Sequence, residues 1–121
     1  MIRLVVLSSG ADGQSHVEDR VVRVSAHGRD HTSAWLAAGP VRFAESPAGS
    51  ALDWHNAPHR QLVVTLSGTL DFVTRGGEQF RLAPGDVLLA EDTAGGGHRW
   101  SLVDDQPWRR LYVQVPADLQ L

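Results

Sequence analysis

The chain has 121 residues, of which 42% are hydrophobic, and carries a formal net charge of -3 at pH 7. This length suits one domain with an ordinary core, so we expect residues 1–121 to form a single unit. Cysteine is absent, which excludes disulfide frameworks and thiolate metal sites such as zinc fingers. The basic residues are all arginine and are scattered, so no basic stripe is available to bind nucleic acid.

The chain begins with a short apolar segment, residues 2–7, which we interpret as a strand. Its apolar run is too short for the hydrophobic region of a secretory signal peptide. No other stretch approaches the roughly 20 apolar residues that cross a bilayer. We therefore expect a cytoplasmic protein with no membrane partner.

Short apolar or alternating segments separated by Gly, Pro, Asp and Ser continue to the end of the chain, which is typical of a β-sandwich or barrel. After the first strand, we predict strands over residues 17–25, 41–45, 51–55, 61–66, 69–75, 78–82, 87–90, 98–103 and 111–115.

Three local patterns add detail to this prediction of strands. Glycines in Ser67-Gly68 and in residues 75–77 lie at hairpin spacing, which predicts two consecutive antiparallel hairpins. Residues 87–90 are apolar on both faces, which predicts a strand buried on both sides within a closed or two-layered sheet. Only residues 31–38 have helical composition, and Gly39-Pro40 would end such a helix after at most two turns.

Side chains that can bind a metal are concentrated between Asp53 and Gln61, just ahead of a predicted strand. If residues 59–61 are extended, His59 and Gln61 point to the same face, about 7 Å apart. His55 can join them only if the chain bends at Ala57-Pro58, which proline favours.

This segment resembles the first motif of the cupin superfamily, G-x5-H-x-H-x(3 or 4)-E-x6-G. Gly49, His55, Gln61 and Gly68 fall in register with its first Gly, first His, Glu and last Gly. The second motif, G-x5-P-x-G-x2-H-x3-N, is matched more loosely.

In that second motif Gly85 matches the first position, and His98 matches the histidine after a longer loop. The resemblance covers residues 41–115. It implies an all-β, cupin-type double-stranded β-helix, a jelly-roll barrel of about ten short antiparallel strands. Residues 1–40 would pack on the barrel or swap between barrels.

In a typical cupin, the two histidines and the glutamate of the first motif and the histidine of the second bind one divalent metal inside the barrel. Ala57 replaces the second histidine here and Gln61 replaces the glutamate. The resemblance therefore implies His55, Gln61 and His98 as metal ligands, and we expect His59 to complete the set. These neutral donors suit Fe, Mn, Ni, Co or Zn as the divalent transition metal.

We also expect a substrate pocket beside these ligands. Trp100 follows His98 by two residues, so it should share the inward face and form an apolar wall. Tyr112 and Glu45 are polar groups on predicted core strands and are further pocket candidates.

Other polar features have simpler interpretations. His16, His27 and His31 are expected on the surface. Residues 95–97 lack the strand, helix and Lys of a phosphate-binding loop, so we interpret them as a flexible lip of the pocket. Glu91 and Asp92 are adjacent acids on a loop and are expected to be solvated.

The leading functional hypothesis is a metal-dependent lyase, isomerase, cyclase or dioxygenase acting on a small organic substrate. One alternative is a metal-free pocket enzyme with His55 or His59 as general base and Gln61 as hydrogen-bond donor. Another is a non-catalytic module that binds a small ligand. In each case we expect a homodimer, with residues 2–7 as a pairing edge.

Overall fold

The computed structural model describes residues 1–121 as twelve strands and no helix. All ten predicted strands are present, and two short strands, β3 and β4, are additional. No helix that is long and apolar enough to cross a bilayer occurs in the structure. The strands are β1 (Arg3–Ser9), β2 (Ser15–Val21), β3 (Ser25–His27), β4 (Asp30–Thr32), β5 (Val41–Ser46), β6 (Ala51–His55), β7 (Gln61–Ser67), β8 (Leu70–Thr74), β9 (Gln79–Leu82), β10 (Val87–Glu91), β11 (His98–Leu102) and β12 (Trp108–Gln114).

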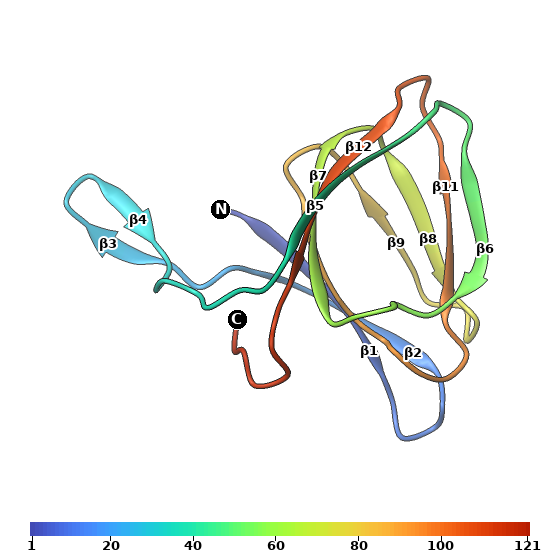
Figure 1. The fold of residues 1–121 in the computed structure, drawn as a ribbon, viewed down its shortest axis with the longest axis horizontal. Helices are drawn as coiled ribbons and strands as arrows, with labels where there is room; N and C mark the ends of the chain where they lie inside the picture. Colours follow the sequence, from blue (N-terminus) through green and yellow to red (C-terminus); the bar gives the residue numbers. More distant parts are fainter.

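Two sheets face each other and enclose the main core (Figure 1). The larger sheet has six strands in the order β2-β1-β10-β7-β12-β5, and the smaller has four in the order β6-β11-β8-β9. Strand alternation directs one face of each sheet inward, as in β8, where Leu70, Phe72 and Thr74 are buried and Asp71 and Val73 are less so. The interior between the sheets is therefore where side chains from both can meet.

The centre of the larger sheet is buried on both faces, as the apolar run in β10 predicts. Leu88 and Ala90 belong to the main core, whereas Leu89 belongs to a second cluster on the opposite face. The C-terminal residues Leu119 and Leu121 pack against that second cluster. The outer face of this sheet is thus covered by the end of the chain.

Strand β1 differs from the expectation in two respects. It pairs with β10 in parallel, with Leu4 opposite Val87, so the barrel is not wholly antiparallel. It also lies between β2 and β10, which leaves it no free edge for pairing with another chain. The edges of the six-stranded sheet are β2 and β5.

The turn at Gly68 is a crossing between sheets, and the prediction of a hairpin there is wrong. β7 belongs to the six-stranded sheet and β8 to the four-stranded sheet. Gly68 has φ +90°, and a Cβ atom there would lie 2.9 Å from the carbonyl oxygen of Pro107. Because glycine tolerates both, the chain can turn sharply from one layer to the other. The predicted hairpin at residues 75–77 is present between β8 and β9.

The β3–β4 hairpin projects away from the barrel (Figure 1). It lies in an arm, residues 23–38, whose side chains are exposed except for the half-buried Leu36. The helix predicted over residues 31–38 does not form. A helix of two turns is too short to be stable unless one of its faces packs on the rest of the protein, and the side chains of this arm are exposed.

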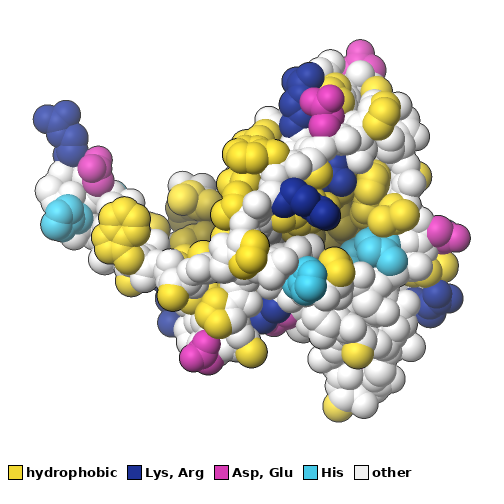
Figure 2. Space-filling view, viewed as in Figure 1, with side chains coloured by type: hydrophobic (Ala, Val, Ile, Leu, Met, Phe, Trp, Pro, Cys, Tyr) yellow, Lys and Arg dark blue, Asp and Glu magenta, His cyan; other side chains and the backbone are white.

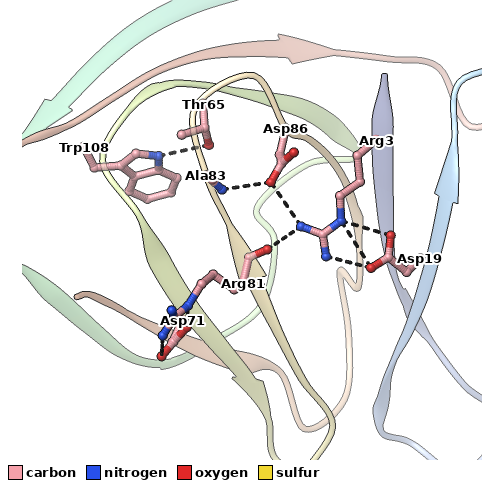
Figure 3. Close-up of polar contacts among 8 residues, drawn as sticks. All are labelled: Arg3, Asp19, Thr65, Asp71, Arg81, Ala83, Asp86 and Trp108. Atoms are coloured by element: carbon pink, nitrogen blue, oxygen red, sulfur yellow. Dashed lines mark hydrogen bonds and ion pairs between the residues drawn. The ribbon is translucent and has the colours of Figure 1, made fainter. Parts of the chain in front are cut away.

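Arg3 in β1 links β2, the turn before β10 and β9 of the smaller sheet (Figure 3). Its Nη2 and Nε atoms donate to the Asp19 carboxylate of β2, at 2.6 and 3.0 Å. Its Nη1 atom donates to Asp86 in the turn before β10, at 3.0 Å, and to the carbonyl oxygen of Arg81. Asp86 also accepts a hydrogen bond from the backbone of Ala83, which fixes the turn.

Candidate functional site

His55 and His98 lie opposite each other on neighbouring strands. His55 ends β6 and His98 begins β11, and the two residues are register partners in the antiparallel pair. Side chains of such partners lie on the same face, and the two ring centroids are 4.4 Å apart. The register of β6 then shifts by one residue before Trp100, so a bulge lies beside the pair.

Each imidazole has its Nδ1 atom engaged and its Nε2 atom without a hydrogen-bond partner. His55 Nδ1 donates to the carbonyl oxygen of Asp53 at 2.7 Å. His98 Nδ1 donates to the Asp92 carboxylate at 2.6 Å, and Ser15 donates to the same carboxylate oxygen at 2.6 Å. These bonds fix the ring orientations and leave the Nε2 atoms as the reactive positions.

Asp92 is fully buried, contrary to the expectation that it is solvated. It follows Leu88 and Ala90 at two-residue spacing, so it continues the inward face of β10 just beyond the end of that strand. Its Oδ1 atom has no hydrogen-bond partner. Glu91 points the other way and pairs with Arg60 at 2.8 Å. Of the two acids, Asp92 alone supports the site.

Burial lowers the pKa of His55 below its ordinary value, because a half-buried ring loses solvation that would favour the protonated form. The nearby His98 lowers this pKa further by charge repulsion, while the Asp53 carbonyl and the Asp92 carboxylate act in the opposite direction. His55 is therefore neutral near pH 7.

Residues 95–97 pack tightly and do not form a free lip. Gly97 has φ +76°, and a Cβ atom there would lie 2.4 Å from the carbonyl oxygen of His55. Gly95 similarly approaches the carbonyl oxygen of Gly13. The Arg75 side chain donates to the carbonyl oxygen of Gly96 at 3.0 Å. This loop therefore packs closely against the end of β6, next to the histidine pair.

The histidine pair lines a cavity of about 320 Å³ inside the barrel. Figure 2 shows hydrophobic side chains in a hollow on this face of the molecule, with arginine and histidine side chains nearby. A larger hollow of about 610 Å³ lies elsewhere, beside β6, β8 and β11, and none of the histidines lines it. We place the candidate site in the smaller cavity because titratable side chains converge there.

Four of the predicted site residues besides the histidine pair can now be placed. Gln61 begins β7, is buried, and lines the cavity with an amide that makes no hydrogen bond to the protein. Trp100 is buried in the cavity wall, 4.7 Å from the Trp108 ring, and Tyr112 also lines the cavity. Glu45 is exposed and pairs with Arg109 at 2.7 Å, so it lies outside the cavity.

His59 does not join the histidine pair. Residues 56–60 form an irregular corner, so the alternation that would orient His59 like Gln61 does not apply. His59 is exposed and lines a neighbouring hollow with Pro58 and Gln114. The bend at Pro58 was expected to bring His59 and His55 together, but the two residues line different hollows.

The fold was compared with those of known proteins. No model of a known protein family matches the chain, and no curated protein matches it. The structure is similar to the Cnp3 cupin domain of Schizosaccharomyces pombe, with a TM-score of 0.52 and 19% identity over 94% of this chain and 82% of that one. It is also similar to a Cupin 2 conserved barrel domain protein of Salinispora arenicola, with a TM-score of 0.50 and 17% identity. The chain has the cupin fold.

This cupin barrel spans only part of some of the structures that it matches. The match covers 64% of this chain and 62% of the Salinispora protein. It covers 62% of this chain and 64% of a cupin superfamily protein of Desulfitobacterium hafniense, with a TM-score of 0.49 and 15% identity. At these identities the likeness shows the fold, and the function has to be argued from the site.

The cupin resemblance implies a metal, and the donors available for it in the cavity are few. No group of three or more His, Cys, Asp or Glu side chains lies close enough together to hold a metal ion. His55 and His98 both present Nε2, and Gln61 adds one neutral amide. The set thus has three donors with no carboxylate or thiolate among them, one fewer than a four-ligand site, and the residues do not fit a firmly held metal.

Arg110 is a cavity residue that the sequence analysis missed. It is 9% exposed and lies on the inward face of β12 between Trp108 and Tyr112. The predicted strand began at residue 111. Had it begun at Trp108, two-residue alternation would have placed Arg110 on the same face as that tryptophan.

Proposed function

We propose that this chain is an acid–base enzyme that moves a proton on a small organic molecule held inside the barrel. The observation that supports the proposal is the buried pair of His98 and Asp92, with 2.6 Å between Nδ1 and the carboxylate oxygen, next to the neutral His55. A histidine oriented by a buried carboxylate is well suited to general-base catalysis.

His98 Nε2 accepts a proton from a C–H bond beside a carbonyl group of the substrate, and Asp92 stabilises the resulting imidazolium. His98 then returns the proton to another atom of the same molecule, so the net reaction is an isomerisation. His55 Nε2 accepts a hydrogen bond from a substrate hydroxyl, and the Gln61 amide donates to the carbonyl oxygen as negative charge develops on it.

A metal-dependent reaction is the competing proposal. It rests on the fact that both Nε2 atoms are free while both Nδ1 atoms are bonded, which is the arrangement of metal-bound histidines. Elemental analysis of protein purified without added metal tests it. We expect much less than one equivalent of any transition metal, because only two imidazoles converge. A full equivalent that is lost in both His55→Ala and His98→Ala would establish the metal site instead.

Solvent exchange provides a direct assay for proton transfer. The protein would be incubated in D2O with hydroxyketones, such as dihydroxyacetone and acetoin, and with 2-oxo acids, such as pyruvate and 2-oxobutyrate. Deuterium incorporation at carbon would be followed by NMR with and without a strong chelator. We expect at least one compound to exchange, and His98→Gln to slow its exchange by about a hundredfold or more.

His59→Gln is the matched control, because His59 is an exposed histidine from the same region of the chain. It should exchange at the rate of the unmodified protein. Exchange that stops on chelation would overturn the metal-free mechanism. Compounds that bind without exchanging would show a ligand-binding module in place of an enzyme.

A further inference from the structure

Arg110 is a buried cation without a carboxylate partner. Its guanidinium carbon lies 3.9 Å from the centre of the Trp108 ring and 5.5 Å from that of Tyr112. It makes no ion pair, whereas its neighbour Arg109 pairs with Glu45 on the outer surface. A buried charge that only aromatic rings and neutral groups surround is costly to keep, and an anion in the cavity would offset that cost.

The hydrogen bonds of Arg110 leave one end of its guanidinium free. Nε donates to the Tyr112 hydroxyl at 3.0 Å. Nη1 donates to the Ser46 hydroxyl at 2.9 Å and to the carbonyl oxygen of Trp108 at 3.0 Å. These bonds use three of the five N–H donors, and both donors on Nη2 remain available. The protein thus fixes the group in place and leaves an unused donor atom.

The charges around the cavity have one sign. Arg42 and Arg110 both line it, and no Asp or Glu is among its lining residues. Arg42 on β5 is the register partner of Tyr112, its guanidinium carbon lies 5.6 Å from the centre of that ring, and its side chain is exposed. The nearest acid to the histidine pair, Asp92, is fully buried behind His98. An anion entering the cavity therefore meets two cations and no competing carboxylate.

We propose that the cavity binds a small organic carboxylate, with the carboxylate group on Nη2 of Arg110 and the rest of the molecule directed toward the histidine pair. This inference rests on the proposed function for what happens to the ligand, but the binding itself does not depend on catalysis. The cavity of about 320 Å³ suits a ligand of a few carbon atoms. Arg42 contributes attraction at long range, which salt should weaken.

Binding can be measured with matched pairs of compounds that differ in charge alone. Acetate, pyruvate and benzoate would be compared with acetamide, pyruvamide and benzamide by calorimetry and by the shift in Tm. We expect one or more carboxylates to bind and to raise Tm, and the corresponding amide to bind much more weakly. Arg110→Gln should weaken carboxylate binding about ten- to hundredfold.

Arg109→Gln is the matched control, because it removes a neighbouring arginine on the outer face of the same strand. It should leave carboxylate affinity unchanged. Arg110→Lys keeps the charge but loses the fixed planar fork, so it should recover only part of the affinity. Circular dichroism and Tm would confirm that each variant is folded.

Equal binding of carboxylates and amides, or equal loss of affinity in Arg109→Gln and Arg110→Gln, would overturn the inference. Binding of inorganic phosphate and phosphate esters in preference to every carboxylate would overturn the assignment of the anion. Carboxylate binding that depends on Arg110, without deuterium exchange on any compound, would uphold this inference and refute the proposed isomerisation.

Discussion

Two imidazole rings lie side by side in the barrel, and their environments differ. His98 faces a buried carboxylate, whereas His55 faces only a backbone carbonyl oxygen. A second positive charge on the pair would be opposed by the first and by the loss of water around His55. Protonation of His55 is therefore disfavoured.

The lowered pKa of His55 predicts a defined pH dependence of stability. The unfolded chain binds a proton on this residue more readily than the folded chain. The contribution of His55 to stability is therefore complete above the unfolded pKa of about 6.5 and is lost as pH falls through the folded value. NMR titration of the ring should place its midpoint below that of free histidine, and His55→Gln should flatten this part of the stability profile from urea unfolding. A ring that titrates at or above the value of free histidine would contradict the prediction.

Asp92→Asn tests whether the carboxylate positions His98. The variant keeps the size of the side chain and one acceptor oxygen, but its amide can either donate or accept, so the ring tautomer is no longer fixed. We expect exchange activity to fall by about a hundredfold or more. Nitrogen-15 NMR of His98 should show the Nδ1–H tautomer in the unmodified protein and a mixture in the variant. An unchanged tautomer would leave Asp92 with a purely structural role.

Among the elements, the glycine loop and β6 are in close contact at the site. Gly97→Ala should displace the carbonyl of His55, because the added Cβ would lie 2.4 Å from it. Gly77→Ala is the control, since Gly77 also has a positive φ but has no atom within 4 Å of the added Cβ. Both should lose about 1 kcal/mol in urea unfolding from the positive φ. Only Gly97→Ala should lose more and shift the NMR signals of His55.

Arg3 makes an element-scale prediction of a different kind. Arg3→Met keeps the aliphatic stem but removes the links from β1 to Asp19 and Asp86, and should cost about 1 kcal/mol of unfolding free energy. Arg81→Met removes an isolated, exposed pair with Asp71, drawn in the same view (Figure 3), and should cost less than about 0.5 kcal/mol. Equal losses in the two variants would show that the network around Arg3 adds nothing.

At the scale of the whole molecule, the side chains of the arm are exposed apart from the half-buried Leu36. Trp35 in this arm is fully exposed, and Phe43 on the edge strand β5 is 74% exposed. Exposed aromatic side chains and a free strand edge commonly mark an interface, so we propose a homodimer formed through the arm and β5. Light scattering should give twice the chain mass, and Trp35→Ser should shift the equilibrium toward monomer. Val103→Ser, at an exposed apolar residue outside these segments, should have no effect. A monomer at every concentration would contradict the proposal.

Much of this fold could be predicted because alternation is a local property of the sequence. Each of the ten expected strands is present, and motif spacing singled out His55 and His98, whose rings lie 4.4 Å apart in the structure. Which strands pair is a long-range property, so the crossing at Gly68 and the position of β1 could not be predicted. The β3–β4 hairpin was missed because its residues are polar and exposed and leave no apolar pattern.

The missed site residues have a common origin. Asp92 and Arg110 lie just beyond the ends of the predicted strands. The alternation of inward and outward side chains was therefore not applied to them. Both side chains point inward, whereas charged residues are normally expected on the surface. His59 shows the reverse error, because alternation was applied across a corner that is not extended.

The parallel pairing of β1 with β10 has a consequence for synthesis of the protein. Leu4 and its partner Val87 are far apart in the sequence, so Val87 leaves the ribosome long after Leu4. Until then β1 can pair only with β2, and an isolated hairpin of two strands is marginally stable. The apolar side chains of β1 therefore stay exposed to solvent on the nascent chain until β10 has been made, and β1 and β10 can pair only after that.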